Sequence, residues 1–472
     1  MPQEQKTKVA IVGVGTVGTG VARLLLDHGD RTARHAGRIL WLEKAVVSDL
    51  SKTRDIDLPA GVLSDRLEDV LADPEITVVA HLVGGLEPAR TITLRLLEAG
   101  KDVVTANKAM LAEFGPELFD RARQLGRSIA FEASVGGGIP VIANVSQCFS
   151  ANQITSLEGI LNGTTNYIIW RMEEEGLSYA DSLLEAQRLG YAEADPTMDV
   201  DGSDAAQKLA ILAHLAFGAR THWKDIPRVG LEAVQLADIQ YASQLGYRIR
   251  LIASAELTDG GLRLSVAPTL VRKGHPLAEV RGPYNAVAIV GDAVGDIFLH
   301  GQGAGQMPTA SAVVADMIDT AVGRTALTFK TLELWSDRPP LIAAVAPHLI
   351  ASRYYLRTAV RDEPGVLAEI TGILGRQQIS IASVIQHEPD ATRNDGLVPL
   401  VIITHESPEL AIRKAVREIA ALPSVSNSAT VLPIRTRRGG ARSAKFSASA
   451  QSSAQFPPDR NTAAASAAVG KR

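Results

Sequence analysis

An acidic segment that ends in a lysine is the part of the chain best suited to chemistry. Its five carboxylates, all within residues 190–204, are Glu193, Asp195, Asp199, Asp201 and Asp204. Lys208 follows Asp204 by four residues, so on a helix the two side chains would share one face. The rest of that helix is apolar, which predicts a half-buried position for the lysine. Repelling carboxylates beside one lysine suit the recognition of an ammonium group and the donation of a proton to a nascent alkoxide.

Two other interpretations of this segment stay open. The Asp204–Lys208 pair alone is usually a solvated helix pair worth roughly 0.3 kcal/mol. A divalent-cation site is the main rival to the catalytic interpretation, because ligands that are all oxygen atoms suit Mg²⁺ or Ca²⁺. Pro196 and Gly202 predict a loop over residues 193–202, and Ser203 or Asp204 can begin the helix that follows.

A second chemical signal is a glycine-rich turn near the start of the chain. Gly13, Val14, Gly15, Thr16, Val17 and Gly18 fit the pattern G-x-G-x-x-G. A β-branched run precedes the turn and an amphipathic helix follows it, which is the context that a dinucleotide site requires. Gly13 would permit the tight turn, Gly15 the approach of a pyrophosphate, and Gly18 the close packing of helix on strand. The helix N-terminus would supply N–H groups and a positive dipole end to the phosphates.

Charged residues after two further strands bear on the cofactor. Asp49 could accept a hydrogen bond from a ribose 2′-hydroxyl and favour NAD, whereas Lys52 and Arg54 could neutralise a 2′-phosphate and favour NADP. An ordinary polar loop explains all three equally well. Lys108 comes just after a buried-type strand, where the carboxyl ends of parallel strands face the ligand crevice, so it is a reasonable cation for cofactor or substrate.

The elements that must position these residues fall into three domains. Over residues 1–135, β-branched runs alternate with helical periodicity, which predicts an α/β Rossmann-type domain with a doubly wound parallel sheet. Its expected strands are residues 9–12, 39–47, 77–83, 102–105 and 128–132, and its expected helices are 17–26, 88–99 and 116–125.

Residues 136–322 predict an α+β domain that binds the substrate, with strands at 155–161, 248–256, 262–268, 286–290 and 296–299 and helices at 167–175 and 204–216. A glycine-rich turn opens a further helix at about 303–322, which could complete the first domain. Prolines make 323–352 a predicted linker. The order β-α-β-β-α-β over 353–435 predicts a ferredoxin-like domain, and the Ser/Ala-rich residues 436–472 predict a disordered tail.

Bulk composition narrows the class of protein. With 472 residues, 46% hydrophobic and 21% charged, the chain can bury several cores. It has no apolar run of about 18 residues and no charged-then-apolar leader, so we expect a cytoplasmic protein with no membrane span. The net charge of −4 predicts no general attraction to nucleic acid or anionic lipid. Cys148 is the one cysteine, and its apolar setting predicts a buried structural thiol.

From residue 8 to residue 435 the chain resembles the homoserine dehydrogenase family, in its longer bacterial form with a C-terminal ACT domain. The most specific part of the resemblance is Ala186-x-x-x-Gly190-Tyr191-Ala192-Glu193-Ala194-Asp195-Pro196-x-x-Asp199-Val200-x-Gly202-x-Asp204-x-x-x-Lys208. The runs at 132–140 and 161–166 are also typical of the family, and residues 362–367 resemble the first strand-to-helix turn of an ACT module.

The resemblance implies reversible, NAD(P)-linked interconversion of L-aspartate 4-semialdehyde and L-homoserine, in the route to threonine, methionine and isoleucine. Lys208 would donate a proton to the carbonyl oxygen as the hydride arrives, and Asp204 would orient Lys208. Glu193 would bind the substrate amino group, Lys108 would lie between cofactor and substrate, and Gly305 would touch the cofactor. The other implied substrate contacts are Asp199, Asn162, Gly163 and Thr164.

The resemblance also bears on ions, cofactor choice and regulation. The family binds a monovalent metal, typically sodium, here implied at Glu132 and the backbone oxygens of Val135, Gly137 and Ile139. Many relatives carry arginine in place of Ser48 to hold the 2′-phosphate, so the cofactor is NADP or NAD, with Lys52 and Arg54 as possible substitutes. ACT modules bind small amino acids at subunit interfaces, which implies threonine feedback and a homodimer or homotetramer. A dimerisation module without a ligand is the alternative.

Two other classes of function fit parts of the sequence. A catalytically silent amino-acid sensor could use a dehydrogenase scaffold, but it would not need Glu193, Asp204 and Lys208 together. Another Rossmann enzyme acting on an amino-acid aldehyde or acid is disfavoured by residues 162–166 and by the acidic segment.

Overall fold

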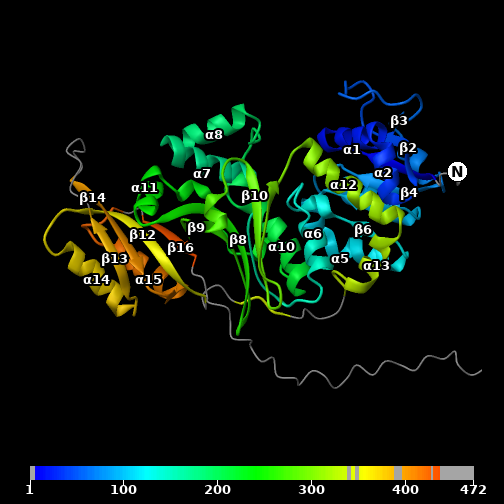
Figure 1. Ribbon diagram of the computed structural model, residues 1–472. Coiled ribbons are helices and arrows are strands. Elements are labelled where there is room, and N and C mark those ends of the chain that lie inside the picture. Colours follow the sequence, from blue (N-terminus) through cyan, green and yellow to red (C-terminus); the bar gives the residue numbers. More distant parts are fainter. Residues whose placement is uncertain (1–5, 337–341, 346–349, 387–395, 427–428, 436–472) are drawn as a thin grey trace, which may run out of the picture. The chain divides into compact units, whose positions relative to one another are not determined.

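The computed structural model describes residues 6–336, 342–345, 350–386, 396–426 and 429–435, and Figure 1 shows its elements. The tail expected at 436–472 lies outside these residues. The first sheet is wholly parallel, and its strands lie in the order β3-β2-β1-β4-β5-β6. They are β1 (Lys6–Val12), β2 (Ile39–Val46), β3 (Leu63–Ser64), β4 (Ile76–His81), β5 (Asp102–Thr105) and β6 (Ile129–Ala130). The reversal of strand order between β1 and β4 confirms the doubly wound domain.

Helices cover both faces of this sheet. They are α1 (Thr16–Asp27), α2 (Gly29–Ala36), α3 (Glu68–Leu71), α4 (Ala89–Glu98), α5 (Lys108–Gln124) and α12 (Gln306–Ala321). Ile11 of β1 packs in one core with Val21 of α1 and Val313 of α12. Leu96 of α4 and Leu118 of α5 belong to the core on the other face. Helix α12 therefore packs against the first sheet together with α1.

Helix α5 begins eight residues before its expected start at residue 116. The side chain of Asn107 accepts a hydrogen bond from the Met110 main-chain N–H at 3.0 Å and so caps the helix. Pro116 lies inside the helix instead of opening it. The expected boundary was wrong because the asparagine cap acts earlier than the proline, and the earlier start places Lys108 in the first turn.

The second domain is built on an antiparallel sheet in the order β11-β10-β7-β8-β9. Its strands are β7 (Ile154–Ile160), β8 (Tyr247–Thr258), β9 (Gly261–Arg272), β10 (Tyr284–Gly291) and β11 (Gly295–Gln302). Its helices are α6 (Val141–Ala143), α7 (Gly163–Glu175), α8 (Tyr179–Arg188), α9 (Thr197–Val200), α10 (Ser203–Phe217) and α11 (Leu236–Gln244). Leu209 and Leu212 of α10 share a core with Leu251 of β8 and Val287 of β10, so α10 is held against the sheet.

The C-terminal domain has the expected ferredoxin-like plan, with the strand order β16-β12-β14-β13. Its elements are β12 (Ala351–Arg361), α14 (Val366–Arg376), β13 (Ile381–Gln386), β14 (Leu397–Thr404), β15 (Ser407–Pro408), α15 (Glu409–Ala420) and β16 (Thr430–Ile434). Strand β16 pairs in parallel with β9 through Ile434 and Leu270. Arg435 and Glu158 form an ion pair at 2.6 Å beside this pairing. The sheet of the second domain therefore continues into the C-terminal domain.

Three local expectations differ from the structure. The 193–202 loop contains the short helix α9, because the Asp195 carboxylate accepts the Thr197 main-chain N–H at 3.1 Å. The predicted linker begins with a helix, α13 (Arg324–Leu332), whose Phe329 stacks on Phe119 with 5.3 Å between ring centroids. Cys148 is exposed, so its expected burial was wrong: it ends a π-helical turn (Asn144–Cys148) that points it away from the neighbouring core.

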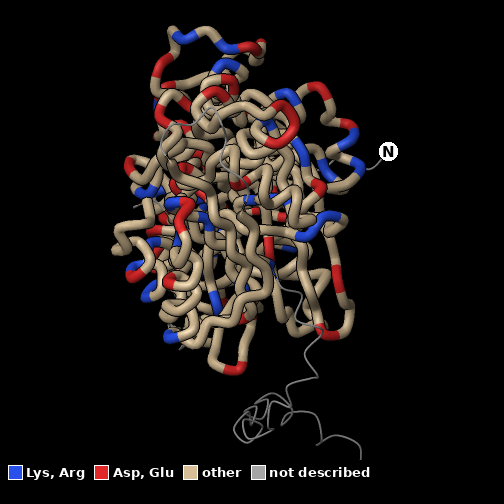
Figure 2. The backbone as a smooth tube through the Cα atoms, turned by 90° about the vertical axis from the view of Figure 1, so that its left-hand side faces the viewer, with Lys and Arg blue, Asp and Glu red and all other residues tan. Residues whose placement is uncertain are grey.

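Basic and acidic residues are interspersed along the described chain (Figure 2), in keeping with the net charge of −4. Among the described residues, no helix has the length and apolar character needed to cross a membrane. The remaining short turns are 3₁₀ segments at Glu132–Ser134, Trp223–Asp225, Leu231–Ala233 and Pro276–Glu279.

Candidate functional site

The glycine-rich turn lies between the carboxyl end of β1 and the start of α1. Gly13 has a φ of +99°, and a Cβ atom there would lie 2.9 Å from the carbonyl carbon of Leu82, just after β4. A Cβ atom on Gly18 would lie 2.1 Å from the carbonyl oxygen of Gly13, so α1 can pack on β1 only with glycine at this position. A Cβ atom on Gly15 would meet nothing within 4 Å. The backbone at Gly15 is therefore open to a pyrophosphate at the helix N-terminus.

Of the other residues of the turn, two pack in the core and one is exposed to solvent. Val14 is buried and Val17 is half-buried, and both pack in the core beneath α1, so the cofactor would meet their main-chain atoms. Thr16 is exposed at the first position of α1. Gly305, with a φ of +120°, directly precedes α12. A Cβ atom on Gly20 would lie 2.9 Å from Cβ of Ala310, so the early turns of α1 and α12 are in contact.

The polar loop after β2 is held by its own side chains. The Asp49 carboxylate accepts hydrogen bonds from the Ser51 hydroxyl at 2.6 Å and the Ser51 main-chain N–H at 2.8 Å, and these bonds lower the pKa of Asp49. Arg54 donates to the main-chain oxygens of Asp49 at 2.6 Å and Lys52 at 2.7 Å. The guanidinium of Arg54 is therefore folded back on the loop, while Ser48 and Lys52 are exposed.

The acidic segment places one carboxylate, that of Asp204, between two lysines. Lys208 Nζ donates to Asp204 Oδ2 at 2.7 Å, and Lys108 Nζ lies 3.1 Å from Asp204 Oδ1. Asn162 Nδ2 donates to Asp204 Oδ2 at 2.9 Å. Lys208 Nζ also donates to the main-chain oxygen of Leu161 at 2.6 Å. The Asp204 and Lys208 side chains are only 7% and 12% exposed, whereas that of Lys108 is 37% exposed.

Each of these groups is placed by the end of a helix or strand. Asp204 and Lys208 occupy the first two turns of α10. Asn162 is the N-cap residue of α7, and its side-chain oxygen accepts the Thr165 main-chain N–H at 2.8 Å. Lys108 is the first residue of α5. Sequence reasoning missed the Leu161 oxygen, because a main-chain acceptor carries no signal in residue type.

The charges at this cluster shift its pKa values in opposite senses. Burial alone would raise the pKa of Asp204, but the Lys208 and Lys108 ammonium groups and the Asn162 amide hold it below its ordinary value. Burial lowers the pKa of Lys208, and the charge of Lys108 lowers it further against the opposing effect of Asp204. The charge of Asp204 raises the pKa of Lys108. Lys208 is therefore the lysine that more readily releases a proton.

Two further carboxylates lie beside the cluster. Asn162 Nδ2 donates to Asp199 Oδ1 at 2.7 Å, and burial together with the charge of Asp204 raises the pKa of Asp199. Glu193 is exposed, and its charge contributes to the raised pKa of Lys108. The structure thus brings Asn162 and Asp199 together with the Asp204–Lys208 pair.

The start of α7 contacts both the acidic segment and the residues just before β10. The Thr164 hydroxyl donates to the main-chain oxygen of Tyr191 at 2.6 Å. A Cβ atom on Gly163 would lie 2.7 Å from the main-chain oxygen of Pro283, so only glycine allows this approach. Val200 of the segment is buried in the core that also contains Ile168 of α7.

The rival interpretation of a divalent-cation site finds no support here. In the part of the chain that the structure describes, no group of three or more His, Cys, Asp or Glu side chains is arranged to hold a metal ion. Asp204 and Asp199 direct their oxygen atoms at Asn162 and the two lysines. The arrangement suits proton transfer and ammonium recognition.

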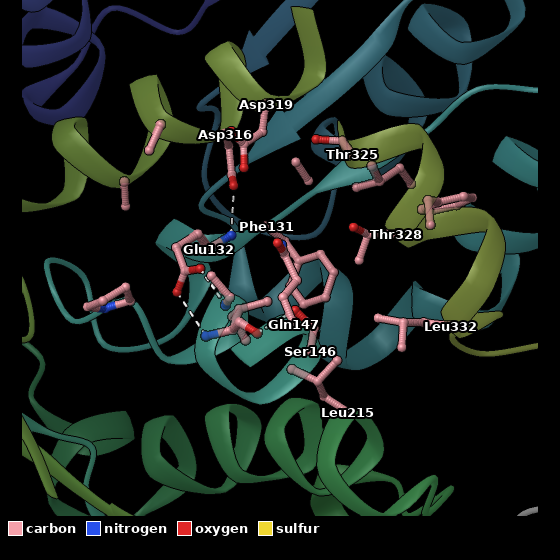
Figure 3. A pocket seen from close by; sticks show the side chains of 18 of the residues that line it. Phe131, Glu132, Ser146, Gln147, Leu215, Asp316, Asp319, Thr325, Thr328 and Leu332 are labelled. Carbon is pink, nitrogen blue, oxygen red and sulfur yellow. Dashed lines mark hydrogen bonds between the residues drawn. The ribbon is translucent and has the colours of Figure 1, made fainter. Parts of the chain in front are cut away.

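Glu132 lies in a second buried acidic region, shown in Figure 3. Its carboxylate oxygens accept the main-chain N–H groups of Ile142 at 2.9 Å and Ala143 at 2.7 Å, and its own N–H donates to Asp316 Oδ2 at 2.8 Å. Burial raises the pKa of Glu132 to about 7 and that of Asp316 well above its usual range. With Asp319 these carboxyl groups line a cavity of about 350 Å³.

The turn after Glu132 presents main-chain oxygens of two kinds. The oxygens of Val135 and Gly137 accept no hydrogen bond from the described residues, whereas that of Ile139 accepts the Val141 N–H at 2.7 Å. A carboxylate with nearby free carbonyl oxygens is donor chemistry that a hard cation accepts. The Glu132 carboxylate and the free oxygens of Val135 and Gly137 are therefore ligands of the kind that could hold a cation.

A parallel sheet in this order, an open glycine turn after β1, and a buried lysine–carboxylate pair in the adjoining domain together define a nicotinamide-dependent dehydrogenase.

Comparison with known proteins identifies the family. Residues 13–132 match the family described as "Homoserine dehydrogenase, NAD binding domain", residues 140–318 match "Homoserine dehydrogenase", and residues 354–421 match "ACT domain". A homoserine dehydrogenase of Pseudomonas aeruginosa is 43% identical and aligns over 89% of this chain and 96% of its own length. The chain belongs to the homoserine dehydrogenase family of NAD(P)-dependent oxidoreductases.

Solved structures agree with this assignment. The crystal structure of a homoserine dehydrogenase from Thiobacillus denitrificans is 38% identical and covers 92% of this chain and 99% of that chain, with a TM-score of 0.84. A hyperthermophilic archaeal homoserine dehydrogenase in complex with NADPH is 26% identical and covers 67% of this chain and 97% of that chain, with a TM-score of 0.56.

Proposed function

We propose that this enzyme reduces L-aspartate 4-semialdehyde reversibly to L-homoserine with NADPH or NADH, and that Lys208 is its proton donor. The observation that carries the assignment is the geometry of the Lys208 ammonium group, which donates to Asp204 Oδ2 at 2.7 Å and to the Leu161 main-chain oxygen at 2.6 Å. An ammonium group has three N–H donors, so one remains for a carbonyl oxygen of the substrate.

The nicotinamide, when bound, supplies the hydride to the aldehyde carbon. Lys208 donates its proton to the carbonyl oxygen, which becomes the hydroxyl of the product. Asp204 orients Lys208 and compensates the charge of both lysines. Because burial lowers the pKa of Lys208, the ammonium group is a stronger acid than an exposed lysine would be.

The carboxylates around the lysines support recognition of an amino-acid substrate. Glu193 and Asp199 are the groups that we assign to the substrate ammonium. Asn162, Gly163 and Thr164 would hold the amino-acid end of the substrate, since they connect the start of α7 to both the Asp204–Lys208 cluster and the acidic segment. Lys108, more exposed than Lys208, would face the junction of substrate and cofactor.

For the cofactor, we assign the pyrophosphate to the backbone of 13–18 and the region before α12 at Gly305. The NADPH bound to the archaeal relative supports NADP, with exposed Lys52 and Ser48 beside the ribose and Asp49 and Arg54 shaping the loop. We assign a sodium ion to Glu132 and to the backbone oxygens of Val135, Gly137 and Ile139, in keeping with the free carbonyls there.

Regulation and assembly follow from the C-terminal domain. We propose that threonine binds the ACT domain and inhibits the enzyme, within a homodimer or homotetramer of the threonine, methionine and isoleucine route. Titration of activity against threonine tests this, together with a direct binding measurement. If saturating threonine neither inhibits the enzyme nor binds to it, the ACT domain is an assembly module only.

The central experiment follows NADPH and NADH oxidation with aspartate semialdehyde in the wild type, Lys208→Ala and Lys414→Ala. Lys414 is exposed on α15 and serves as a matched control. We expect activity in the wild type and in the control, and a kcat lower by on the order of 10²-fold or more in Lys208→Ala, as for other lost general acids. Near-normal turnover of Lys208→Ala would remove Lys208 from the mechanism.

A further inference from the structure

Asn285, near the start of β10, carries a buried amide without a complete set of partners. Its side chain is 1% exposed, and its Oδ1 atom accepts no hydrogen bond in the described part of the chain. An unpaired buried amide oxygen is destabilising, because it has lost its hydrogen bonds to water without gaining others. Such groups are rare in folded proteins, and their retention calls for a physical reason.

The neighbours of Asn285 are the two loops that we assign to substrate and cofactor. A Cβ atom built on Gly303 would lie 2.0 Å from both Cγ and Nδ2 of Asn285, so the amide lies directly against the Gly303 backbone. A Cβ atom on Gly163, in the substrate motif, would lie 3.5 Å from Asn285 Oδ1. Gly303 stands two residues before Gly305, which precedes α12. Asn285 thus lies between the start of α7 and the turn that enters α12.

Both loops are also held from their other sides. Asn166 of α7 donates through Nδ2 to the main-chain oxygen of Gly282 at 2.9 Å, which fixes the turn just before β10. A Cβ atom on Gly137 would lie 2.5 Å from the Gly303 oxygen, and Gly138 N–H donates to the Gln302 oxygen at 2.9 Å. The 301–305 turn is therefore wedged between the Asn285 amide and the 136–138 turn, and cannot relax away from Asn285 without breaking these contacts.

We infer that Asn285 is a positioning residue that sets the separation between the substrate motif 162–164 and the cofactor turn 301–305. Its planar amide fills the space against Gly303 where a tetrahedral branched side chain such as leucine would overlap the backbone. This inference rests on the proposed function, because it takes these two loops as the substrate and cofactor sides of the site. Displacement of reacting groups by about 1 Å costs on the order of 10²-fold in rate, so a spacer at this position has a large effect on turnover.

The test is a double-variant cycle of Asn285→Ala, Gly303→Ala and the two combined. Gly303 does not have a positive φ, and the Asn285 side chain supplies all three of the nearest contacts that a Cβ atom there would make. We expect each single variant to lower kcat roughly tenfold or more and to raise the Kd for NADPH, measured by nicotinamide fluorescence. In the double variant the methyl group introduced by Gly303→Ala occupies the space that the amide vacates, so kcat recovers at least several-fold over Gly303→Ala alone.

The control is Thr358→Val on β12, which removes another buried, unpartnered polar atom far along the chain. It should change neither kcat nor the NADPH Kd. If Asn285→Ala does not fold, Asn285→Ser empties the same space and carries the same expectation. A double variant no better than Gly303→Ala, or a kcat and NADPH Kd of Asn285→Ala within twofold of wild type, overturns the inference. NADPH binding is measured without substrate, so a wild type inactive on aspartate semialdehyde would reject the proposed substrate and leave this test intact.

Discussion

Two buried acidic groups in the molecule are neutralised in opposite ways. At Asp204, two lysine ammonium groups and an asparagine amide surround one carboxylate, and the pKa of Asp204 lies below its ordinary value. At Glu132, main-chain N–H groups and a second carboxyl group surround the carboxylate, and burial raises its pKa to about 7. No lysine or arginine lines the cavity in the described residues, although Arg324 pairs with Asp319 at its edge.

The difference separates the proton-transfer centre that we propose at Lys208 from the ion site that we propose at Glu132. A lysine paired with a carboxylate keeps a mobile proton at a fixed atom, which reduction of a carbonyl requires. A desolvated carboxylate that no cationic side chain reaches is stabilised either by protonation or by a cation from solution. The two acidic groups should therefore respond differently to loss of a charge and to added salt.

The largest effect is expected for Asp204→Asn. The substitution leaves Lys208 and Lys108 without their shared counter-charge in a buried site. Lys208 therefore loses its orientation, and its pKa falls further. We expect kcat to fall on the order of 10²-fold or more, measured with saturating cofactor and substrate. Exposed Asp65→Asn is the control. Turnover within threefold of wild type would mean that Asp204 does not orient the donor.

The pH dependence of the rates of aldehyde reduction and homoserine oxidation tests the same Asp204–Lys208 centre. Because the pKa of Lys208 is lowered from 10.5, the fraction of ammonium falls, and reduction slows, as pH rises through a value below 10.5. In the proposed mechanism, oxidation of homoserine needs the neutral amine of Lys208, so the rate of oxidation should rise over the same pH interval. Removal of the Lys108 charge raises the pKa of Lys208, so Lys108→Gln should move the alkaline limb to higher pH. A shift to lower pH in the variant would contradict this electrostatic account.

At the other acidic group, the expected effect is on stability. Sodium chloride should raise the Tm of the wild type relative to choline chloride at equal ionic strength, by a few degrees at saturation, because an ion that binds only the folded state stabilises it. Glu132→Gln removes the anionic ligand and should abolish the difference between the two salts. Equal Tm values in both salts for the wild type would argue against a sodium site at Glu132.

The smallest effect is expected for Asp316→Asn. The pKa of Asp316 is raised well above its usual range, so a neutral amide replaces a group that already favours its neutral form. Asparagine also keeps an oxygen that can accept the Glu132 N–H. We expect kcat within twofold of wild type and a Tm change of at most a few degrees, against the large loss from the same chemical change at Asp204. A loss as large as that of Asp204→Asn would remove the contrast between the two groups.

Much of the architecture was predictable because it rests on local patterns. The β1–turn–α1 unit follows from a β-branched strand, three glycines and an apolar helix face, all within about twenty residues. The predicted start of α5 was wrong because Pro116 was taken as the first helical residue, whereas the Asn107 side chain caps the helix earlier. Helix α13 was missed because the contact of its Phe329 with Phe119 is a tertiary contact. The domain boundaries at 135, 322 and 352 stay predictions.

The glycine-rich turn and the pairing of Asp204 with Lys208 could be predicted from the sequence, because helix geometry alone sets two side chains four residues apart side by side. The tertiary structure was needed to show that the Leu161 oxygen, 47 residues away, accepts a hydrogen bond from the same ammonium group. It alone showed the contact between Asn285 and Gly303 and the absence of any lysine or arginine from the described lining of the Glu132 cavity. Periodicity and capping act over a few residues, whereas these contacts depend on how separate helices and strands pack, and no local pattern encodes that.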